Sequence, residues 1–212
     1  MLDYLERALP GPLKLPSDRR WRLLREPAIG LVIPDLLIGI APSSEQNPAR
    51  RRCTLVQTHI VAALESEGAL TTRQLIKRLY LRDENAYTAL AQLLRFGNIV
   101  EVGPSRWAVA EAASTRQFEV VAIEAKLRRW REALDQAITY REFANRAYVV
   151  LDGNQVRSAA KIIPVFREAA VGLLLQYGPL LTLEADAAIT RKNVCPHRVQ
   201  AVDKLFDTAR VE

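Results

Sequence analysis

The segment FEVVAIEAK, residues 118–126, is an apolar run that ends in two opposite charges, Glu124 and Lys126. Its β-branched composition predicts a buried strand. Side chains alternate between the two faces of a strand, so Glu124 and Lys126 share one face and Ala125 lies on the other. A chain that folds around this strand must therefore place a carboxylate and an ammonium group side by side at its end.

Two explanations are open for this pair of charges. A solvent-exposed strand end would carry a surface ion pair that contributes ~0–1 kcal/mol, and a pattern as short as E-x-K arises often by chance. A functional site would need further polar groups nearby. Residues 29–40, IGLVIPDLLIGI, supply one, because this strand-like run contains Asp35 after Pro34. A Pro-Asp pair often marks a turn, but apolar residues continue beyond it, so we expect Asp35 to be held on regular structure as a rigid metal ligand needs.

The residues after Lys126 predict alternating helices and strands. Residues 127–147 have one apolar helical face, on whose edge Gln136 and Tyr140 are four positions apart and therefore stacked. A strand over 148–152, a helix over 158–170 and a strand over 171–178 follow. This order predicts an α/β fold with a mixed central sheet flanked by helices.

Two polar joints, residues 41–52 and 111–117, separate residues 53–110 as an inserted unit. We therefore expect a discontinuous core of residues 1–52 and 111–212 around one inserted domain. The insert predicts three helices, with Thr71 or Thr72 and then Asp83 as N-caps of the second and third. Two short strands over 99–102 and 106–109, joined by a Gly-Pro-Ser turn, complete it.

Three helices followed by a β-hairpin resemble a winged helix-turn-helix domain. That resemblance implies a third helix in the DNA major groove and a hairpin that touches the backbone or minor groove. The positions it assigns to DNA contact are Glu84, Asn85, Thr88, Gln92 and Arg95 on the third helix and Arg106 on the hairpin.

The charge of the insert is nearly balanced, with six basic and five acidic residues in 53–110. Phosphate contacts supply much of the affinity of DNA-binding proteins, so a role of the insert in protein contacts stays open. Residues 126–146 hold six basic and three acidic residues, among them Arg128 and Arg129. We expect Arg128 and Arg129 to hold phosphates, although a solvated helix face would have the same composition. The net charge of +6 and the pI near 9.6 favour an anionic partner, nucleic acid above all.

The elements Pro34-Asp35, Glu124-Ala125-Lys126 and Gln136-x-x-x-Tyr140, in this order, resemble the PD-(D/E)XK phosphodiesterases, the restriction-endonuclease-like superfamily. The last element is similar to that of the RecB-type branch. The resemblance covers the chain outside the insert and implies a restriction-endonuclease-like sheet that binds Mg²⁺ or Mn²⁺. The ligands it implies are Asp35, Glu124, the backbone carbonyl of Ala125 and, as a candidate on an N-terminal helix, Glu6.

In this family Lys126 would orient or deprotonate the attacking water, and Gln136 and Tyr140 would position the nucleic-acid backbone or brace the site. Core packing explains Tyr140 equally well. The resemblance thus predicts a metal-dependent endonuclease that cuts duplex DNA as a homodimer, with a role in defence, repair or mobile-element processing. Two alternatives stay open: a non-catalytic DNA-binding regulator, and a subunit of a larger complex whose insert docks a partner protein.

The compartment is predicted from cysteines and hydropathy. The two cysteines, Cys53 and Cys195, cannot form a disulfide-rich scaffold and fit a reducing compartment. Cys195 and His197 give too few ligands for a structural zinc site. No run approaches the roughly 20 apolar residues of a membrane span. We therefore expect a soluble cytoplasmic protein.

Overall fold

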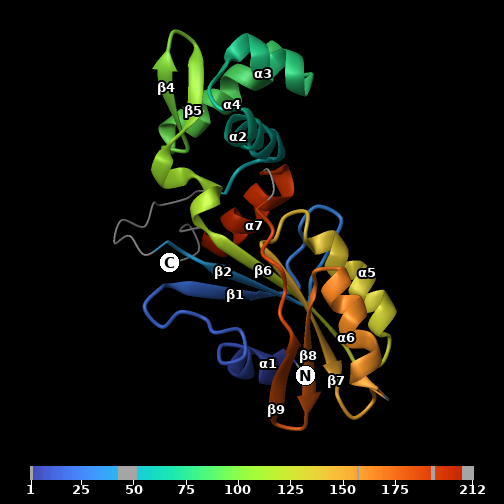
Figure 1. The fold of residues 1–212 in the computed structure, drawn as a ribbon. Helices are drawn as coiled ribbons and strands as arrows, with labels where there is room; N and C mark the ends of the chain where they lie inside the picture. Colours follow the sequence, from blue (N-terminus) through green and yellow to red (C-terminus); the bar gives the residue numbers. More distant parts are fainter. Residues whose placement is uncertain (1, 43–51, 157, 192–193, 207–212) are drawn as a thin grey trace. The chain divides into compact units, whose positions relative to one another are not determined.

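The computed structural model describes residues 2–42, 52–156, 158–191 and 194–206 (Figure 1). The chain divides into two compact units. The first, which we call the sheet unit, consists of Met1–Ala41 and Glu119–Lys192. The second, the insert unit, consists of Pro42–Phe118 and Asn193–Glu212.

The sheet unit is built on a mixed six-stranded sheet in the order β1-β2-β6-β7-β8-β9. Its strands are β1 (Trp21–Arg25), β2 (Leu36–Ile40), β6 (Glu119–Lys126), β7 (Arg146–Asp152), β8 (Gly172–Tyr177) and β9 (Leu180–Ala185). The neighbours β6, β7 and β8 run parallel, whereas every other neighbouring pair is antiparallel. The predicted α/β class with a mixed sheet is confirmed.

Helices cover this sheet because its strands are apolar on both faces. On one face Ile123 and Ala125 of β6 pack in a core with Leu5 and Leu9, from α1 (Leu2–Ala8) and the turn that follows it. Helix α5 (Trp130–Tyr140) packs against β6 and β7, and α6 (Ala159–Glu168) packs against β8 and β9. Each parallel crossover thus contains one helix, and Figure 1 shows α5 and α6 next to each other.

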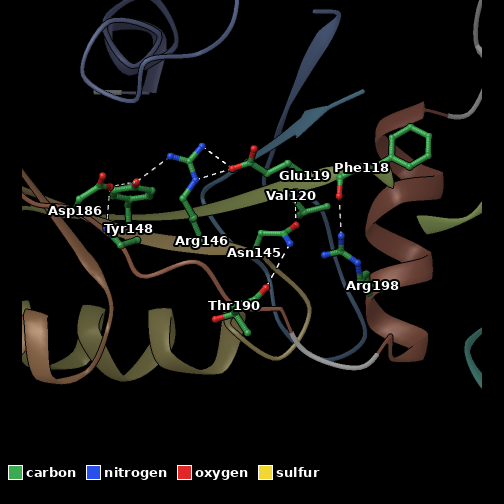
Figure 2. Close-up of polar contacts among 10 residues, drawn as sticks. Phe118, Glu119, Val120, Asn145, Arg146, Tyr148, Asp186, Thr190 and Arg198 are labelled. Carbon is green, nitrogen blue, oxygen red and sulfur yellow. Dashed lines mark hydrogen bonds and ion pairs between the residues drawn. The ribbon is translucent and has the colours of Figure 1, made fainter. Parts of the chain in front are cut away.

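A polar network fixes the start of β6 against β7 (Figure 2). The Arg146 guanidinium donates to the Glu119 carboxylate at 2.6 Å and to the Tyr148 hydroxyl at 3.3 Å. Tyr148 in turn donates to Asp186, which follows β9. The Asn145 side chain accepts from the Val120 N–H at 2.8 Å. These bonds set the register that places the other end of β6, where Glu124 and Lys126 lie.

The described residues of the insert unit form four α-helices, α7 among them, and a three-stranded sheet. Its elements are α2 (Leu55–Glu67), β3 (Leu70–Thr71), α3 (Thr72–Leu79), α4 (Asp83–Arg95), β4 (Ile99–Gly103) and β5 (Arg106–Val109), with the strand order β3-β5-β4. Thr54 and Thr71 cap α2 and α3 through reciprocal capping boxes with Gln57 and Gln74. Two short 3₁₀ helices, η1 (Glu111–Ala113) and η2 (Thr115–Gln117), and α7 (Pro196–Phe206) complete the unit.

The C-terminal helix α7 lies with the insert unit, which differs from the predicted division of the chain. We expected residues 111–212 to belong to the core, but Val199 is buried in the same core as Ile60 of α2. Arg198 donates to the carbonyls of Phe118 and Thr115, as Figure 2 shows for Phe118. The helix is therefore held by apolar packing and by backbone acceptors that no sequence pattern predicts. Most of the predicted polar joint, residues 43–51, lies outside the described residues.

Several element boundaries also differ from expectation, three of them near the predicted site or cap residues. The strand predicted over 29–40 begins only at Leu36, because Gly30 adopts a positive φ of 59° and Pro34 has no N–H for a strand ladder. The helix predicted over 127–147 covers only Trp130–Tyr140. Asp83 is the first residue of α4, and Arg82 is its N-cap.

In the described part of the chain, no helix is both long and apolar enough to cross a membrane.

Gly172, at the start of β8, leaves no room for a side chain, because a Cβ atom would overlap the ring of the fully buried Tyr148. We predict that Gly172→Ala destabilises the protein by about 1–3 kcal/mol, because a buried ring has no room to move. Gly153→Ala is the matched control, since the Tyr177 ring that its Cβ would meet is 38% exposed and has solvent to move into. Urea unfolding measures both variants, and equal midpoints would contradict the prediction.

Candidate active site

The site begins where the pairing of β2 with β6 stops. The last paired residues are Leu36 and Ile123, so one further step of the same register places Asp35 opposite Glu124. Pro34 cannot continue the ladder because it has no N–H. The N–H of Ala125 instead donates to Asp35 Oδ2 at 2.7 Å. A carboxylate thus takes the place of a backbone partner, which fixes Asp35 beside the end of β6.

Glu124 is a buried carboxylate whose two oxygens both have partners. Only 2% of its side chain is exposed. Tyr140 of α5 donates to Glu124 Oε2 at 2.7 Å, and Lys126 Nζ lies 2.9 Å from Oε1. Because Glu124 is buried, the pair is not the solvent-exposed surface ion pair that was one explanation of the sequence. A carboxylate removed from water needs partners such as Tyr140 and Lys126.

The surroundings of Glu124 hold its two partners in their proton-bearing forms. Burial, together with the hydrogen bond to Glu124, raises the pKa of Tyr140 above its usual range. The hydrogen bond to Glu124 also raises the pKa of Lys126, against the effect of desolvation. Near neutral pH Tyr140 consequently stays a phenol and Lys126 stays an ammonium group, and both can donate to Glu124.

Gln136 adds a polar atom whose hydrogen-bonding capacity is unused. Its Oε1 is buried without a hydrogen-bond partner among the described residues. Gln136 precedes Tyr140 by about one turn of α5, so both side chains lie on the same side of the helix. Since a buried polar atom without a partner costs free energy, Gln136 is a candidate to bind a water, an ion or a substrate group.

The predicted fourth ligand, Glu6, does not join this group. Both of its carboxylate oxygens accept from Arg25, at 2.5 and 2.8 Å, and Arg25 also pairs with Asp3. This bidentate pair lowers the pKa of Glu6 and ties both of its oxygens to Arg25. Within the described residues, no three His, Cys, Asp or Glu side chains are grouped so that they could hold a metal ion.

Asp35 and Glu124 still fit a hard divalent cation. Mg²⁺ is commonly bound by only one or two carboxylates, with water and substrate phosphate oxygens filling its other positions. Asp35 Oδ1 accepts no hydrogen bond from the described residues. The backbone carbonyl of Ala125, which lies between Glu124 and Lys126 in β6, remains a candidate ligand.

The predicted DNA-contact residues lie on two surfaces, one in each unit. Arg128 and Arg129 are exposed after β6, and Arg129 pairs with Glu132 at 2.9 Å. In the insert unit the exposed positions are Glu84, Asn85, Thr88, Gln92 and Arg95 on α4 and Arg106 on β5. Gln92 Oε1 accepts from Gln57 of α2, so this side chain also holds two helices together.

Sequence reasoning missed a group of residues that line a pocket between the starts of α5 and α6. Arg131, Ser158 and Lys161 line it together with Arg128. The sequence did contain a signal that could have identified these residues. Each of them follows a predicted strand of the parallel part of the sheet, and ligand crevices form at the carboxyl ends of such strands.

Comparisons with known proteins add little to this geometry. No family model and no curated protein matches the chain. A solved structure of a protein of unknown function from Silicibacter pomeroyi is similar over 78% of this chain and 88% of its own, with 16% identity and a TM-score of 0.31. A likeness at that level supports no conclusion about function.

The Tyr140 hydroxyl makes the stability of the sheet unit sensitive to alkaline pH. Because its pKa in the folded state is raised above 10.0, its contribution is present below pH 10 and is lost as the pH rises further. We predict that the melting temperature of Tyr140→Phe is lower near neutral pH and falls less steeply above pH 10 than that of the wild type. Tyr177→Phe, which changes a partly exposed tyrosine of the same unit, should keep the wild-type slope. Identical slopes for all three proteins would contradict the prediction.

Proposed function

We propose that this protein is a metal-dependent phosphodiesterase of the restriction-endonuclease-like type that cleaves DNA, with a winged-helix insert. The observation that carries the proposal is the position of Asp35, Glu124 and Lys126 at one strand end, with Tyr140 bonded to Glu124. The order of the strands and helices agrees with the resemblance in the sequence. The proposal includes pairing of two copies, so that one site per chain cuts both strands.

Asp35 and Glu124 would hold Mg²⁺ or Mn²⁺, which when bound lowers the pKa of water and neutralises phosphate charge. Lys126, kept cationic beside Glu124, would orient the attacking water and offset the charge that grows on the phosphate oxygens. Tyr140 keeps Glu124 in place by donating to Oε2, which leaves Oε1 facing Lys126. Gln136 would donate or accept at the substrate backbone, because its buried Oε1 is without a partner among the described residues.

Cleavage of supercoiled plasmid in Mg²⁺ or Mn²⁺ tests this proposal. We expect the wild type to nick or linearise the plasmid, and Asp35→Asn and Lys126→Ala each to lower the rate at least about 100-fold. Asp135→Asn is the matched control, because this carboxylate is exposed on α5 and should leave the rate unchanged. Chelation with EDTA should abolish cleavage by every variant.

A rate for Lys126→Ala equal to that of the wild type would contradict the assignment. Absence of cleavage by all proteins, on plasmid and on single strands, would favour a non-catalytic role of the sheet unit.

A second candidate function, docking of a partner protein, is favoured by the surface of the insert unit. Tyr80 is 95% exposed, Tyr87 60% and Leu94 44%, beside a nearly balanced charge. Aromatic side chains are enriched at protein interfaces, whereas DNA-binding surfaces are strongly basic. The insert therefore needs its own test.

The salt dependence of duplex binding separates the two roles of the insert. If α4 and the hairpin contact phosphates, the double variant Arg95→Gln, Arg106→Gln should bind duplex DNA more weakly, with a slope of log affinity against log salt reduced by about 1–2. The control double variant Arg7→Gln, Arg167→Gln removes the same charge from exposed positions of the sheet unit. Fluorescence anisotropy in EDTA measures both, and equal curves for wild type and Arg95→Gln, Arg106→Gln would favour protein docking.

A further inference from the structure

A pocket of about 500 Å³ opens between the start of α5 and the start of α6. Its lining contains Arg128, Trp130, Arg131, Gln155, Val156, Ser158, Lys161, Ile162 and Val165. Three of these residues are cationic and none is acidic. Its size is within the range of about 300–1,000 Å³ that is typical of small-molecule sites.

Within the described residues, no acidic side chain pairs with the cations that line this pocket. The described structure gives Arg128 and Lys161 no ion pair, and both side chains are exposed. The third cation, Arg131, is stacked on the ring of Trp130 at 4.3 Å from the ring centroid. Neither α5 nor α6 has a side-chain hydrogen bond at its N-cap, but Glu132 in the first turn of α5 pairs with Arg129. The start of α6, which has no acidic residue in its first turn, therefore adds positive potential to the pocket.

Apart from the three cations, Gln155 and Ser158, the lining is apolar and aromatic. Trp130 packs on Phe166 with a centroid distance of 6.2 Å, which braces the wall of the pocket from behind. Ile162 and Val165 of α6 extend that wall. A ligand that suits this lining carries an anionic group for the cations and a flat, weakly polar part for the wall. Nucleotides have this combination.

We propose that this pocket binds a nucleotide phosphate, with the anion between Arg128 and Lys161 and the sugar or base against the wall that Trp130 forms. The role that we give to this pocket rests on the proposed function. Arg128 follows Lys126 of the proposed active site by only two residues, or at most about 7 Å along the chain. One unit of the strand that is being cut then lies in the pocket while a neighbouring phosphate lies over Asp35 and Glu124.

The test measures binding in EDTA, where no cleavage occurs. Labelled single-stranded DNA and a deoxynucleoside monophosphate are titrated against the wild type, the double variant Arg128→Gln, Lys161→Gln and the control double variant Arg7→Gln, Arg167→Gln. We expect the pocket variant to lose affinity for at least one of these ligands about tenfold, and the control, with the same change in net charge, to stay within about twofold of the wild type. All four side chains are exposed, so we expect both double variants to fold. Their melting temperatures check this.

The two ligands distinguish the sources of the phosphate. If the pocket variant loses affinity only for single-stranded DNA, the pocket binds a unit of the substrate strand. If it also loses affinity for the monophosphate, the pocket binds a free nucleotide too. Equal affinities of the pocket variant and the wild type for both ligands, or an equal loss in the control, would overturn the proposal. Because the measurement is made without metal, a protein that fails to cleave plasmid still reports on the pocket, and an active protein whose pocket variant binds normally overturns this inference alone.

Discussion

The sheet unit depends on one hydrogen bond at the point where its ladder ends, the 2.7 Å bond from the Ala125 N–H to Asp35 Oδ2. Pro34 stops the pairing of β2 with β6, and without a substitute the Ala125 N–H would lose its partner on that side. Asp35 supplies this substitute, and the same bond orients its carboxylate beside Glu124. The interruption of the ladder is therefore what creates room for a site, since a continued strand would have covered the end of β6 with backbone.

A second constraint follows from the burial of Glu124. A carboxylate that is removed from water requires donors, and removing one partner of such a buried pair typically costs about 3–5 kcal/mol. Tyr140 and Lys126 are these donors, and they come from two elements, α5 and β6 itself. The helix is thus tied to the strand by the group that we propose to be catalytic. The position of Gln136 follows from this, because the helix that delivers Tyr140 also delivers Gln136 about one turn earlier.

The proposed active site and the proposed pocket both use residues at or after the carboxyl ends of parallel strands. Strand β6 leads into the Arg128 region and α5, and β7 leads to Lys161 on α6. In open α/β sheets, ligands bind in the crevice outside the carboxyl ends of the strands. The N-termini of the following helices point toward this edge, and their positive dipole ends favour anionic ligands. The polar network of Arg146, Glu119 and Tyr148 is at the start of the same strands, where it has a structural role in setting the register.

The sequence by itself determined the α/β class, the strand that ends in Glu124 and Lys126, and the three helices followed by a hairpin in the insert, because burial imposes a period on side chains that can be read locally. It also selected Asp35 and Tyr140, although 88 residues separate Asp35 from Glu124 in the numbering. The tertiary structure alone decided that Glu6 pairs with Arg25, that α7 belongs with the insert unit, and that Arg128 and Lys161 line one pocket. Each of these depends on contacts between segments far apart in the chain, whose energies come from shape and from partners that no local pattern encodes.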